Sequence, residues 1–389
     1  MFDRPLTSYY LVLGVTLLLT VLGLLMVLSA SSVNSFSKYG SSYTVFLRQA
    51  TWVALGLPLL WMGSRLPVRT YRALAYPMLL LAAALLVLTL VPGVGIAVNG
   101  NQNWIAVAGF RVQPSEPAKL ALVLWGADLL VRKRRLLAAW KHLLVPLLPV
   151  AGGVTALVLL EGDLGTAVIL VVVTAALLFV AGAPLRLFAL LGLGGAGLVG
   201  YLVLTASYRL ERFRSWGNPF ADLQGSGWQA AHGIYALSSG GWWGLGLGAS
   251  REKWGLLPEA HTDFIFAIIG EELGLVGTLV VLGLFGLLGY AGLRIAVRST
   301  DPFVRLAAAA ATAWLLVQAL VNMGAVLGVL PIAGIPLPLV SYGGSAMLPT
   351  MLALGMLLSF ARGEPGARAA LAARRRHRGT WPGSRRRER

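Results

Sequence analysis

Ten long apolar runs set the limits on how this chain can fold. They cover approximately residues 9–30, 44–63, 73–92, 116–131, 143–160, 165–182, 186–205, 263–290, 304–329 and 346–361. A helix that crosses a bilayer needs about 20 predominantly apolar residues. Hydrophobic residues make up 57% of the 389 positions and charged residues only 12%, which is more apolar surface than a soluble core can bury. The sequence therefore predicts an all-α, polytopic membrane protein with ten transmembrane helices. The first run is longer than a signal-peptide core, so we interpret it as a retained span.

Basic residues predict the orientation of these spans. The chain carries 32 Lys and Arg against 15 Asp and Glu, a formal net charge of +17. Such a charge would suit nucleic-acid binding, but the basic residues flank apolar runs, as they do on the cytoplasmic side of membrane helices. With both termini inside, 23 basic residues fall on the inner side and 9 on the outer side. We therefore predict cytoplasmic termini, a cytoplasmic-membrane location and no nucleic-acid partner.

The same pattern divides the chain into two parts. Residues 1–361 form the predicted membrane domain, with a large outer loop at about 206–262 between the seventh and eighth helices. Residues 362–389 are rich in Arg, Ala and Gly, and we expect a disordered cytoplasmic tail near anionic lipid headgroups.

Several chemistries are disfavoured because their motifs are missing. The chain has no cysteine, so it has no disulfide, no thiolate metal site and no cysteine nucleophile. It also lacks a GxxxxGK[ST] phosphate loop, an HExxH zinc motif and a GxSxG serine elbow. ATP hydrolysis and serine-dependent hydrolysis on this chain are therefore not expected.

The unusual polar residues lie on the outer side. The large outer loop contains Trp216, Trp228, Trp242, Trp243 and Trp254. Two interpretations are open: an interfacial aromatic belt, or an ordered loop that walls a groove.

Two further outer segments place acids at the mouths of spans. In Gln113–Lys119, Glu116 and Lys119 are three residues apart and share a helix face. They form either a structural ion pair or part of a polar cavity for a charged ligand. In Glu161–Thr166, Asp163 either only caps the sixth helix or also faces that cavity.

The segment Pro258–Ala267 is the most informative. Glu259, His261 and Asp263 are three titratable groups within five residues, directly before an apolar helix. We expect Thr262 or His261 to cap this helix and Asp263 to lie in its first turn. Asp263 beside a histidine at a membrane surface is a candidate general base, and simple charge complementarity with the helix N-terminus is the alternative.

The segment Pro331–Ser345 contains proline and glycine residues that forbid a continuous helix. Irregular backbone at membrane depth is tolerated only inside protein or beside water. We therefore predict a re-entrant outer segment that closes a cavity.

These segments, taken in order, resemble the signatures of a known family. The matching blocks are Gln113–Lys119, Asp163–Ala167, Gly227–Gln229 with Ser238–Gly241, Leu257–Ala267 with Glu271–Gly274, and Ile335–Ser345. They resemble the SEDS family of bacterial cell-shape and division proteins, the FtsW/RodA/SpoVE group, over residues of about 10–361. The run from Pro258 to Ala267 and the step Gly270–Glu272 look more like the FtsW branch than the RodA branch.

Two local departures from the family pattern are visible. Asn103 precedes Trp104 where the family commonly has an arginine, and Gly162 precedes Asp163 where a proline is usual. The first weakens phosphate binding by that arginine, for which Arg111 is a possible substitute.

The resemblance implies a peptidoglycan glycosyltransferase, active on the outer face of the membrane in septal wall synthesis. Its substrate would be lipid II, the undecaprenyl-pyrophosphate-linked disaccharide pentapeptide. Asp263 corresponds to the family's essential aspartate, and Glu116, Lys119 and Asp163 match residues of the family's cavity. The other residues that we predict at the substrate cavity are Gln113, Ser115, Arg111, Lys253, His261, Glu259, Ser341, Gly343 and Gly344.

The leaving pyrophosphate needs positive charge. The candidates on the outer side are Lys119, Arg111, Arg212, Arg214, Arg251 and Lys253. A divalent cation such as Mg or Mn, held by outer carboxylates, is the alternative, and no other cofactor is expected. By resemblance, the partners are a class B penicillin-binding protein, which is a transpeptidase, and other division proteins.

Three other functions stay open at this point. A ten-helix protein with a polar cavity could flip lipid II across the membrane, serve elongation as RodA does, or act as a scaffold for the transpeptidase. A flippase needs polar residues toward the inner side as well, and the inner half offers little beyond Asp128. We therefore favour the polymerase.

Overall fold

The structure is a computed structural model that describes residues 6–98, 101–107, 109–136, 140–205, 210, 213, 215–225 and 227–367. Each predicted apolar run overlaps a helix. These helices are α1 (Thr7–Tyr39), α2 (Thr44–Arg65), α3 (Val68–Thr89), α4 (Ser115–Arg132), α6 (Leu147–Leu160), α7 (Leu164–Val180), α8 (Leu185–Leu204), α11 (Ile265–Arg298), α12 (Pro302–Val326) and α13 (Gly344–Arg362). The predicted tail lies almost entirely outside the described residues, as do Arg212 and Arg214.

Length and composition separate these helices into two groups. Among the described residues, seven are long and apolar enough to cross a membrane: α1, α2, α3, the stretch His142–Leu160, α11, α12 and α13. Helices α7 and α8 contain shorter apolar stretches, Leu164–Val180 and Leu185–Tyr201. Helix α4 is 18 residues long and carries Glu116, Lys119, Asp128 and Arg132. The chain is therefore a multi-pass membrane protein.

The prediction of an all-α chain was wrong in the outer connection between α3 and α4. This connection forms a three-stranded antiparallel sheet of β1 (Gly95–Val98), β2 (Asn101–Val107) and β3 (Phe110–Val112). Ile96 pairs with Trp104, and Ile105 pairs with Val112. Asn101, Gln102 and Asn103 are three polar residues in a row before the apolar Trp104, so β2 lacks the polar–apolar alternation that predicts a strand.

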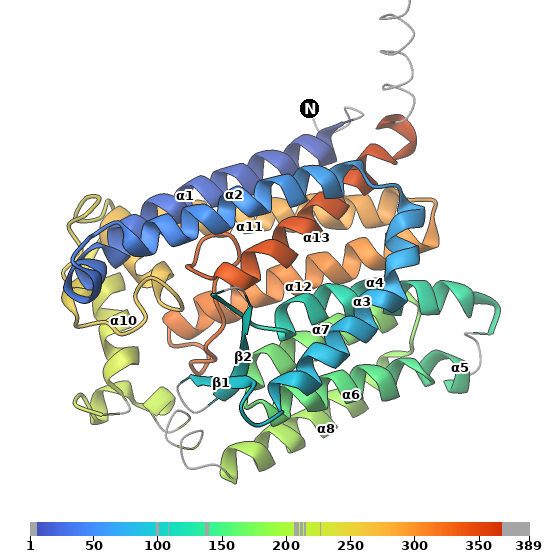
Figure 1. Cartoon of the computed structure of the whole chain (residues 1–389), viewed down its shortest axis with the longest axis horizontal. Coiled ribbons are helices and arrows are strands. Elements are labelled where there is room, and N and C mark those ends of the chain that lie inside the picture. Colours follow the sequence, from blue (N-terminus) through green and yellow to red (C-terminus); the bar gives the residue numbers. More distant parts are fainter. Residues whose placement is uncertain are drawn as a thin grey trace, which may run out of the picture.

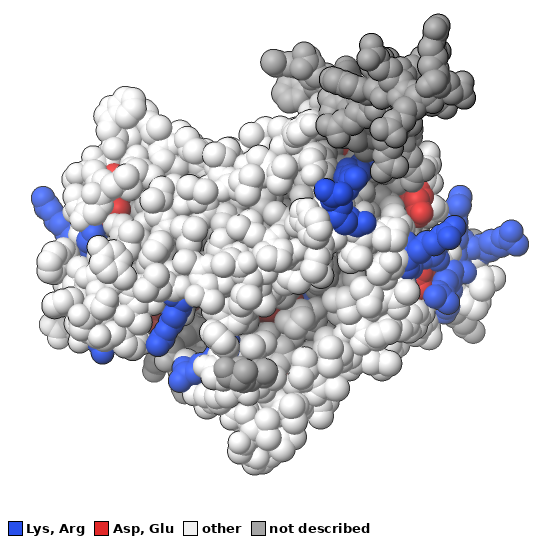
Figure 2. Space-filling model, turned by 45° about the horizontal axis from the view of Figure 1, so that its top comes forward, with Lys and Arg blue, Asp and Glu red and all other residues white. Residues whose placement is uncertain are grey.

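The helices lie side by side along the long axis of the molecule (Figure 1). At one end are the sheet and α10 (Trp228–Ser239), a helix inside the large outer loop. At the other end is the short helix α5 (Trp140–Leu144), which connects α4 to α6. Figure 2 shows Lys and Arg toward the two ends, with a broad uncharged surface between them.

Close helix contacts depend on small residues. Helices α2 and α13 meet at Gly63 and Gly355, where a Cβ added to Gly355 would come within 2.6 Å of the Leu60 carbonyl oxygen. Small residues at such crossings let backbones approach in a bilayer, where no hydrophobic effect drives the helices together. The buried core is continuous along α4, α11, α12 and α13.

Candidate active site

The predicted ion pair at the start of α4 is present. Lys119 Nζ lies 2.8 Å from Glu116 Oε1, and both side chains are almost fully buried. Lys119 also donates to Gln318 Oε1 on α12 at 2.9 Å, and Trp314 Nε1 donates to the same oxygen at 2.8 Å. Glu116 Oε2 and Ser115 Oγ are buried and have no hydrogen-bond partner among the described residues. A buried network with unsatisfied oxygens is expensive to maintain, which is typical of a binding site.

Asp163 both caps α7 and reaches α4. Its Oδ1 accepts a hydrogen bond from the Thr166 backbone N–H at 2.8 Å. Its Oδ2 accepts one from Gln113 Nε2, also at 2.8 Å. Capping is therefore only half of its role, because the other oxygen joins the turn before α7 to the residues that precede α4.

The turn that carries Asp263 differs from the prediction. Helix α11 begins at Ile265, so Asp263 lies before the helix and not in its first turn. The residue at the N-cap position is Phe264, which makes no side-chain cap, so neither His261 nor Thr262 caps the helix. The backbone N–H groups of Thr262 and Phe264 both donate to the Glu259 carbonyl oxygen at 3.1 Å, and the Thr262 hydroxyl donates to Glu259 Oε2 at 2.6 Å. These bonds form a closed turn that places the helix start two residues later than the sequence suggested.

The irregular segment 331–343 lies against this turn. Asn322 on α12 donates from Nδ2 to the carbonyl oxygens of Asp263 and Ile335, each at 2.8 Å. Gly334 has φ 67, and a Cβ added there would be 3.8 Å from Asp263 Oδ2. The Asp263 carboxylate therefore faces a glycine on this segment, where little side-chain bulk separates it from a ligand.

The same segment contacts the other two constellations. Gln318, which binds Lys119, donates from Nε2 to the Pro336 carbonyl oxygen at 3.1 Å. Gly165, in the first turn of α7 after Asp163, approaches the segment so closely that a Cβ there would be 2.6 Å from the Ala333 oxygen. Residues 331–343 thus join the surroundings of Asp263, Lys119 and Asp163, which are far apart in the sequence.

Ser341, Gly343 and Gly344 hold this segment in place. The Ser341 hydroxyl donates to the Thr262 carbonyl oxygen at 2.6 Å and accepts from the Leu337 N–H at 2.8 Å. Gln49 on α2 donates to the Ser341 carbonyl oxygen at 3.2 Å and accepts from the Gly343 N–H at 3.4 Å. A Cβ on Gly344 would collide with the Trp52 indole, so only glycine fits. These residues shape the site from below the surface.

Titration of two outer side chains is altered by their surroundings. Burial lowers the pKa of His261, and Glu259 opposes this shift. Burial raises the pKa of Tyr342, and the nearby Arg48 opposes that shift. The two rings are 5.6 Å apart, and the Tyr342 N–H donates to the His261 carbonyl oxygen at 2.9 Å. Both side chains therefore favour their neutral forms at the edge of the site.

The predicted cations differ in their exposure and in their partners. Arg111 is exposed on β3, and Arg251 is exposed in the outer loop. Lys253 does not reach the Asp263 region, because it is buried against Glu272 of α11, with its Nζ 3.3 Å from Oε1. Within the described residues, no group of three or more His, Asp or Glu side chains is arranged to hold a metal ion.

Sequence reasoning missed the amide residues that connect the site. Gln318 and Asn322 are four residues apart in the second half of α12, which is otherwise apolar over residues 313–326, so they share one face, and Gln49 is a further amide in α2. Isolated polar residues on one face of a membrane helix are the signal that would have found them.

The tryptophans of the outer loop divide between the two interpretations. Trp216 and Trp228 are tied down, with indole N–H groups that donate to the carbonyl oxygens of Gly328 at 2.9 Å and Leu256 at 2.6 Å. Trp242, Trp243 and Trp254 are largely exposed, at 69%, 81% and 70%. The first two fit a wall, and the other three fit an interfacial belt.

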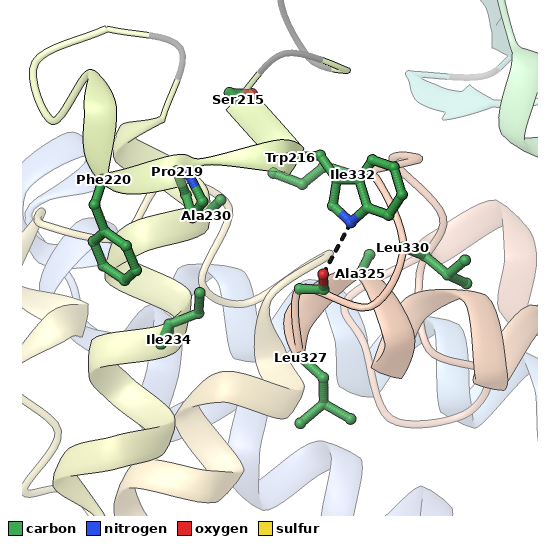
Figure 3. A pocket seen from close by; sticks show the side chains of 11 residues that line it. Ser215, Trp216, Pro219, Phe220, Ala230, Ile234, Ala325, Leu327, Leu330 and Ile332 are labelled. Atoms are coloured by element: carbon green, nitrogen blue, oxygen red, sulfur yellow. Dashed lines mark hydrogen bonds between the residues drawn. The ribbon is translucent and has the colours of Figure 1, made fainter.

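An apolar cavity of about 180 Å³ lies beside the site, between α10 and the end of α12 (Figure 3). Its lining consists of Ser215, Trp216, Pro219, Phe220, Ala230, Ile234, Ala325, Leu327, Gly328, Leu330 and Ile332. Ile332 is two residues from Gly334, which faces Asp263. The cavity therefore shares a wall with the polar region.

Similar proteins identify the chain's relatives. The FtsW of Mycobacterium tuberculosis, a probable peptidoglycan glycosyltransferase, is 47% identical over 372 residues, which are 96% of this chain and 71% of that protein. The stage V sporulation protein E of Bacillus subtilis is 39% identical and covers 90% of this chain and 95% of its own length.

Solved structures agree with these relatives. A chain from a peptidoglycan synthase complex that coordinates polymerization and crosslinking has a TM-score of 0.73 and 29% identity, and covers 91% of this chain and 97% of that chain. The rod shape determining protein RodA of Thermus thermophilus has a TM-score of 0.67 and 28% identity, and covers 92% of this chain and 97% of its own. The family model described as cell cycle protein FTSW_RODA_SPOVE matches residues 9–365. The chain therefore belongs to the FtsW/RodA/SpoVE family of cell cycle proteins.

Proposed function

We propose that Asp263 is the general base of the glycosyl transfer by which this chain polymerises lipid II. The chain is a peptidoglycan glycosyltransferase of the FtsW type, and its role is septal wall synthesis. Its relatives carry the name of this activity, and the geometry around Asp263 supplies a place for it. The residues that carry the reaction are our assignment.

The reaction asks little covalent chemistry of the protein. The 4-hydroxyl oxygen of an acceptor sugar attacks the anomeric carbon of the donor. A new C–O bond forms as the bond to the lipid pyrophosphate breaks, and inversion gives a β-1,4 link. The Asp263 carboxylate takes the hydroxyl proton, and undecaprenyl pyrophosphate leaves with the bonding electron pair. One positioned base contributes about 10²–10⁴-fold to such a step.

The observation that carries this proposal is the convergence on residues 331–343. Asp263 faces Gly334, while Asn322 holds the Asp263 backbone and the same segment together. Through Pro336 and Ala333 this segment contacts the surroundings of Lys119 and Asp163. A carboxylate that faces a glycine, next to a buried polar network, suits proton abstraction from a bound sugar hydroxyl.

The structure narrows the candidates for pyrophosphate contacts. Lys119 is paired with Glu116, and Lys253 with Glu272, so neither is a free cation. Arg111 on β3 is exposed and is our choice for the leaving phosphates. A divalent cation stays an untested alternative, and no step here depends on it.

The substrate and its surroundings complete the proposal. We place ten membrane-spanning helices in the cytoplasmic membrane, with cytoplasmic termini and the site on the outer face. The apolar cavity at Trp216 and Ile234 suits part of a prenyl chain, since its lining is apolar and it adjoins Ile332. A class B penicillin-binding protein is the proposed partner for cross-linking, with other division proteins around it.

The test is lipid II polymerisation in detergent with Asp263→Asn, with and without the transpeptidase partner. We expect a loss of about 100-fold or more in turnover, because the base is removed. Asp301→Asn is the matched control: Asp301 caps α12 by accepting from the Phe303 N–H at 2.8 Å, and asparagine caps equally well. Normal turnover by folded Asp263→Asn would refute the assignment. Absence of polymer from the wild type in detergent, where no membrane side exists, would instead favour a flippase or a scaffold.

A further inference from the structure

A second buried polar cluster lies around Glu271 and Glu272 of α11, several residues after Asp263. We call it the clasp, and it consists of Ser29, Ser250, Lys253, Glu271 and Glu272. Except for Ser29, which is partly buried, each is at most 6% exposed. It joins α1, the large outer loop and α11, and the reaction described above makes no use of it.

Every ionic group in the clasp has a partner. Glu272 accepts from the Ser29 hydroxyl at 2.6 Å and lies 3.3 Å from Lys253 Nζ. Lys253 Nζ also donates to the Gly248 carbonyl oxygen at 2.6 Å. Glu271 accepts from the Ser250 hydroxyl at 2.5 Å and from the Arg251 N–H at 2.8 Å. Two carboxylates and one ammonium ion are thus buried and satisfied, an arrangement that is costly to disturb.

The clasp coincides with a break in α11. Gly274 has φ 68 and ψ −166, a conformation that essentially only glycine adopts. A Cβ there would lie 2.4 Å from the Gly244 nitrogen. The break separates Ile265–Leu273 from the rest of α11, so this first segment is oriented by what holds its two ends.

The outer loop binds the backbone at this break. The N–H groups of Leu245 and Gly246 donate to the carbonyl oxygens of Glu271 and Glu272 at 2.9 and 3.1 Å. The N–H group of Leu275 donates to the Gly241 carbonyl oxygen at 2.9 Å. These bonds replace the intrahelical ones that the break removes, and they fix the end of the segment to the loop.

Asp263 lies at the other end of this segment. At 1.5 Å per residue, Ile265–Leu273 spans about 13 Å, so the clasp cannot touch the reacting atoms. A tilt of a rigid segment at its far end nevertheless moves Asp263. The side-chain anchors at the near end are Asn322, which binds the Asp263 carbonyl oxygen, and Ser341, which binds the Thr262 carbonyl oxygen.

We propose that the clasp positions the base, with Glu272 and Lys253 as positioning residues that set the orientation of Ile265–Leu273 and hence of the Asp263 carboxylate. This inference rests on the proposed role of Asp263. When either residue alone is replaced, the buried charge of the other loses its partner and the segment tilts, and a misplacement of about 1 Å can cost about 100-fold in rate.

The experiment compares Glu272→Gln, Lys253→Met and the double variant in lipid II polymerisation. Turnover is measured per folded molecule, with thermal unfolding measured in parallel. We expect each single variant to lose about 10- to 100-fold in kcat, with KM changed less than about twofold. The double variant should recover most of kcat, because it leaves no buried charge without a partner. Glu364→Gln, at another buried glutamate beyond the end of α13, should leave kcat unchanged.

A structural readout separates this proposal from the role of Asp263. The chain has no cysteine, so Ala260→Cys supplies a unique thiol at a position that is only 6% exposed. We expect maleimide to label this thiol slowly in the wild-type background and at least about tenfold faster with Glu272→Gln, because the turn before α11 is loosened. If Asp263→Asn proved active, Asp263 would not be the general base. The faster labelling with Glu272→Gln would still show that the clasp holds the turn before α11.

Three outcomes would overturn the clasp proposal. One is wild-type kcat in folded Glu272→Gln, and another is a double variant no better than the single ones. If neither single variant folds, Ser29→Ala removes only one donor to Glu272, and we expect a kcat loss of about two- to fivefold. Unchanged kcat in Ser29→Ala is the third.

Discussion

Helix α4 carries a buried acid at each end, and the two acids differ in how many of their oxygens have partners. At the outer end, Glu116 pairs with a buried lysine through one oxygen, and its other oxygen has no partner. At the inner end, Asp128 binds Arg72 Nε through Oδ1 at 2.8 Å and Arg132 Nε through Oδ2 at 2.5 Å. Both arginine side chains reach the surface, at 37% and 60% exposed. The inner acid is fully satisfied, whereas the outer one retains capacity for a ligand.

This difference indicates a structural role for the Asp128 end of α4 and a functional role for the Glu116 end. A satisfied carboxylate that anchors two arginines stabilises the inner turn and fits the positive inner side. A buried carboxylate oxygen without a hydrogen-bond partner lowers the stability of the fold, so its presence points to a role other than stability. Substitutions at the Glu116 end should therefore lower activity, and substitutions at the Asp128 end should mainly lower stability.

The largest effect is expected at Lys119. Lys119→Met should lower polymerisation by about 100-fold or more and lower the unfolding temperature, because Glu116 loses its only ionic partner. The double variant Glu116→Gln with Lys119→Met should recover the unfolding temperature, since no lone buried charge is left, but not the activity. Turnover of lipid II and thermal unfolding in detergent measure the two effects. Recovery of both would reduce the outer pair to a structural one.

Helix α12 allows the same contrast with a smaller effect. Asn322→Ala removes two hydrogen bonds, to the carbonyl oxygens of Asp263 and Ile335, and should lower kcat about tenfold. Thr312→Val is the matched change toward the inner end, where the Thr312 hydroxyl donates only to Ala308 of its own helix. We expect nearly wild-type turnover for Thr312→Val. Equal turnover of the two variants would argue against a division of α12 into a functional half and a structural half.

Asp128 tests the inner end directly. Asp128→Asn leaves Arg72 and Arg132 without a counter-charge, but both reach water, so the loss of stability should be about 1–2 kcal/mol. Turnover per folded molecule should stay within about twofold of wild type. A large fall in kcat without a fall in unfolding temperature would show that the inner end takes part in the reaction.

The sequence predicted the apolar helices and the Glu116–Lys119 pair because both depend on local spacing. Apolar runs identify membrane helices directly, and residues three apart share a helix face. The start of α11 was wrong because it depends on Glu259, whose φ of 54 closes a turn that no residue type announces. The sheet at β1–β3 was missed because its strands are short and β2 lacks the polar–apolar alternation that predicts a strand.

The connections of the site could not be predicted at all. That Gln318 binds Lys119 and that Asn322 binds Asp263 depends on how α12 packs against α4 and on where residues 331–343 lie. Lys253 was assigned to the cavity because it shares the outer side with Asp263, but the break at Gly274 directs it to Glu272. The predicted side of the membrane tells only at which end of the molecule a residue lies. Tertiary packing determines which residue it binds.

The smallest expected effect is a change of stability with pH. It concerns a third buried acid, Glu161, which differs from Asp128 in its partners. Glu161 lies in the outer turn before α7, with no cation among its described partners. The Thr89 hydroxyl donates to its Oε1, its Oε2 has no partner, and Asp163 is nearby. Burial, helped by the Asp163 charge, raises the pKa of Glu161 to about 7 from an ordinary value of 4.5.

The folded state therefore keeps this proton between pH 4.5 and about 7, while an unfolded chain releases it. The contribution of Glu161 to stability is fully present below pH 4.5, falls as the pH rises toward about 7, and is constant above that. Glu161→Gln cannot release a proton there, so its unfolding temperature relative to wild type should rise by a few degrees across that interval. Parallel pH curves for wild type and Glu161→Gln would mean that Glu161 is charged in the folded protein and has a cation nearby, which would make the two ends of the molecule alike.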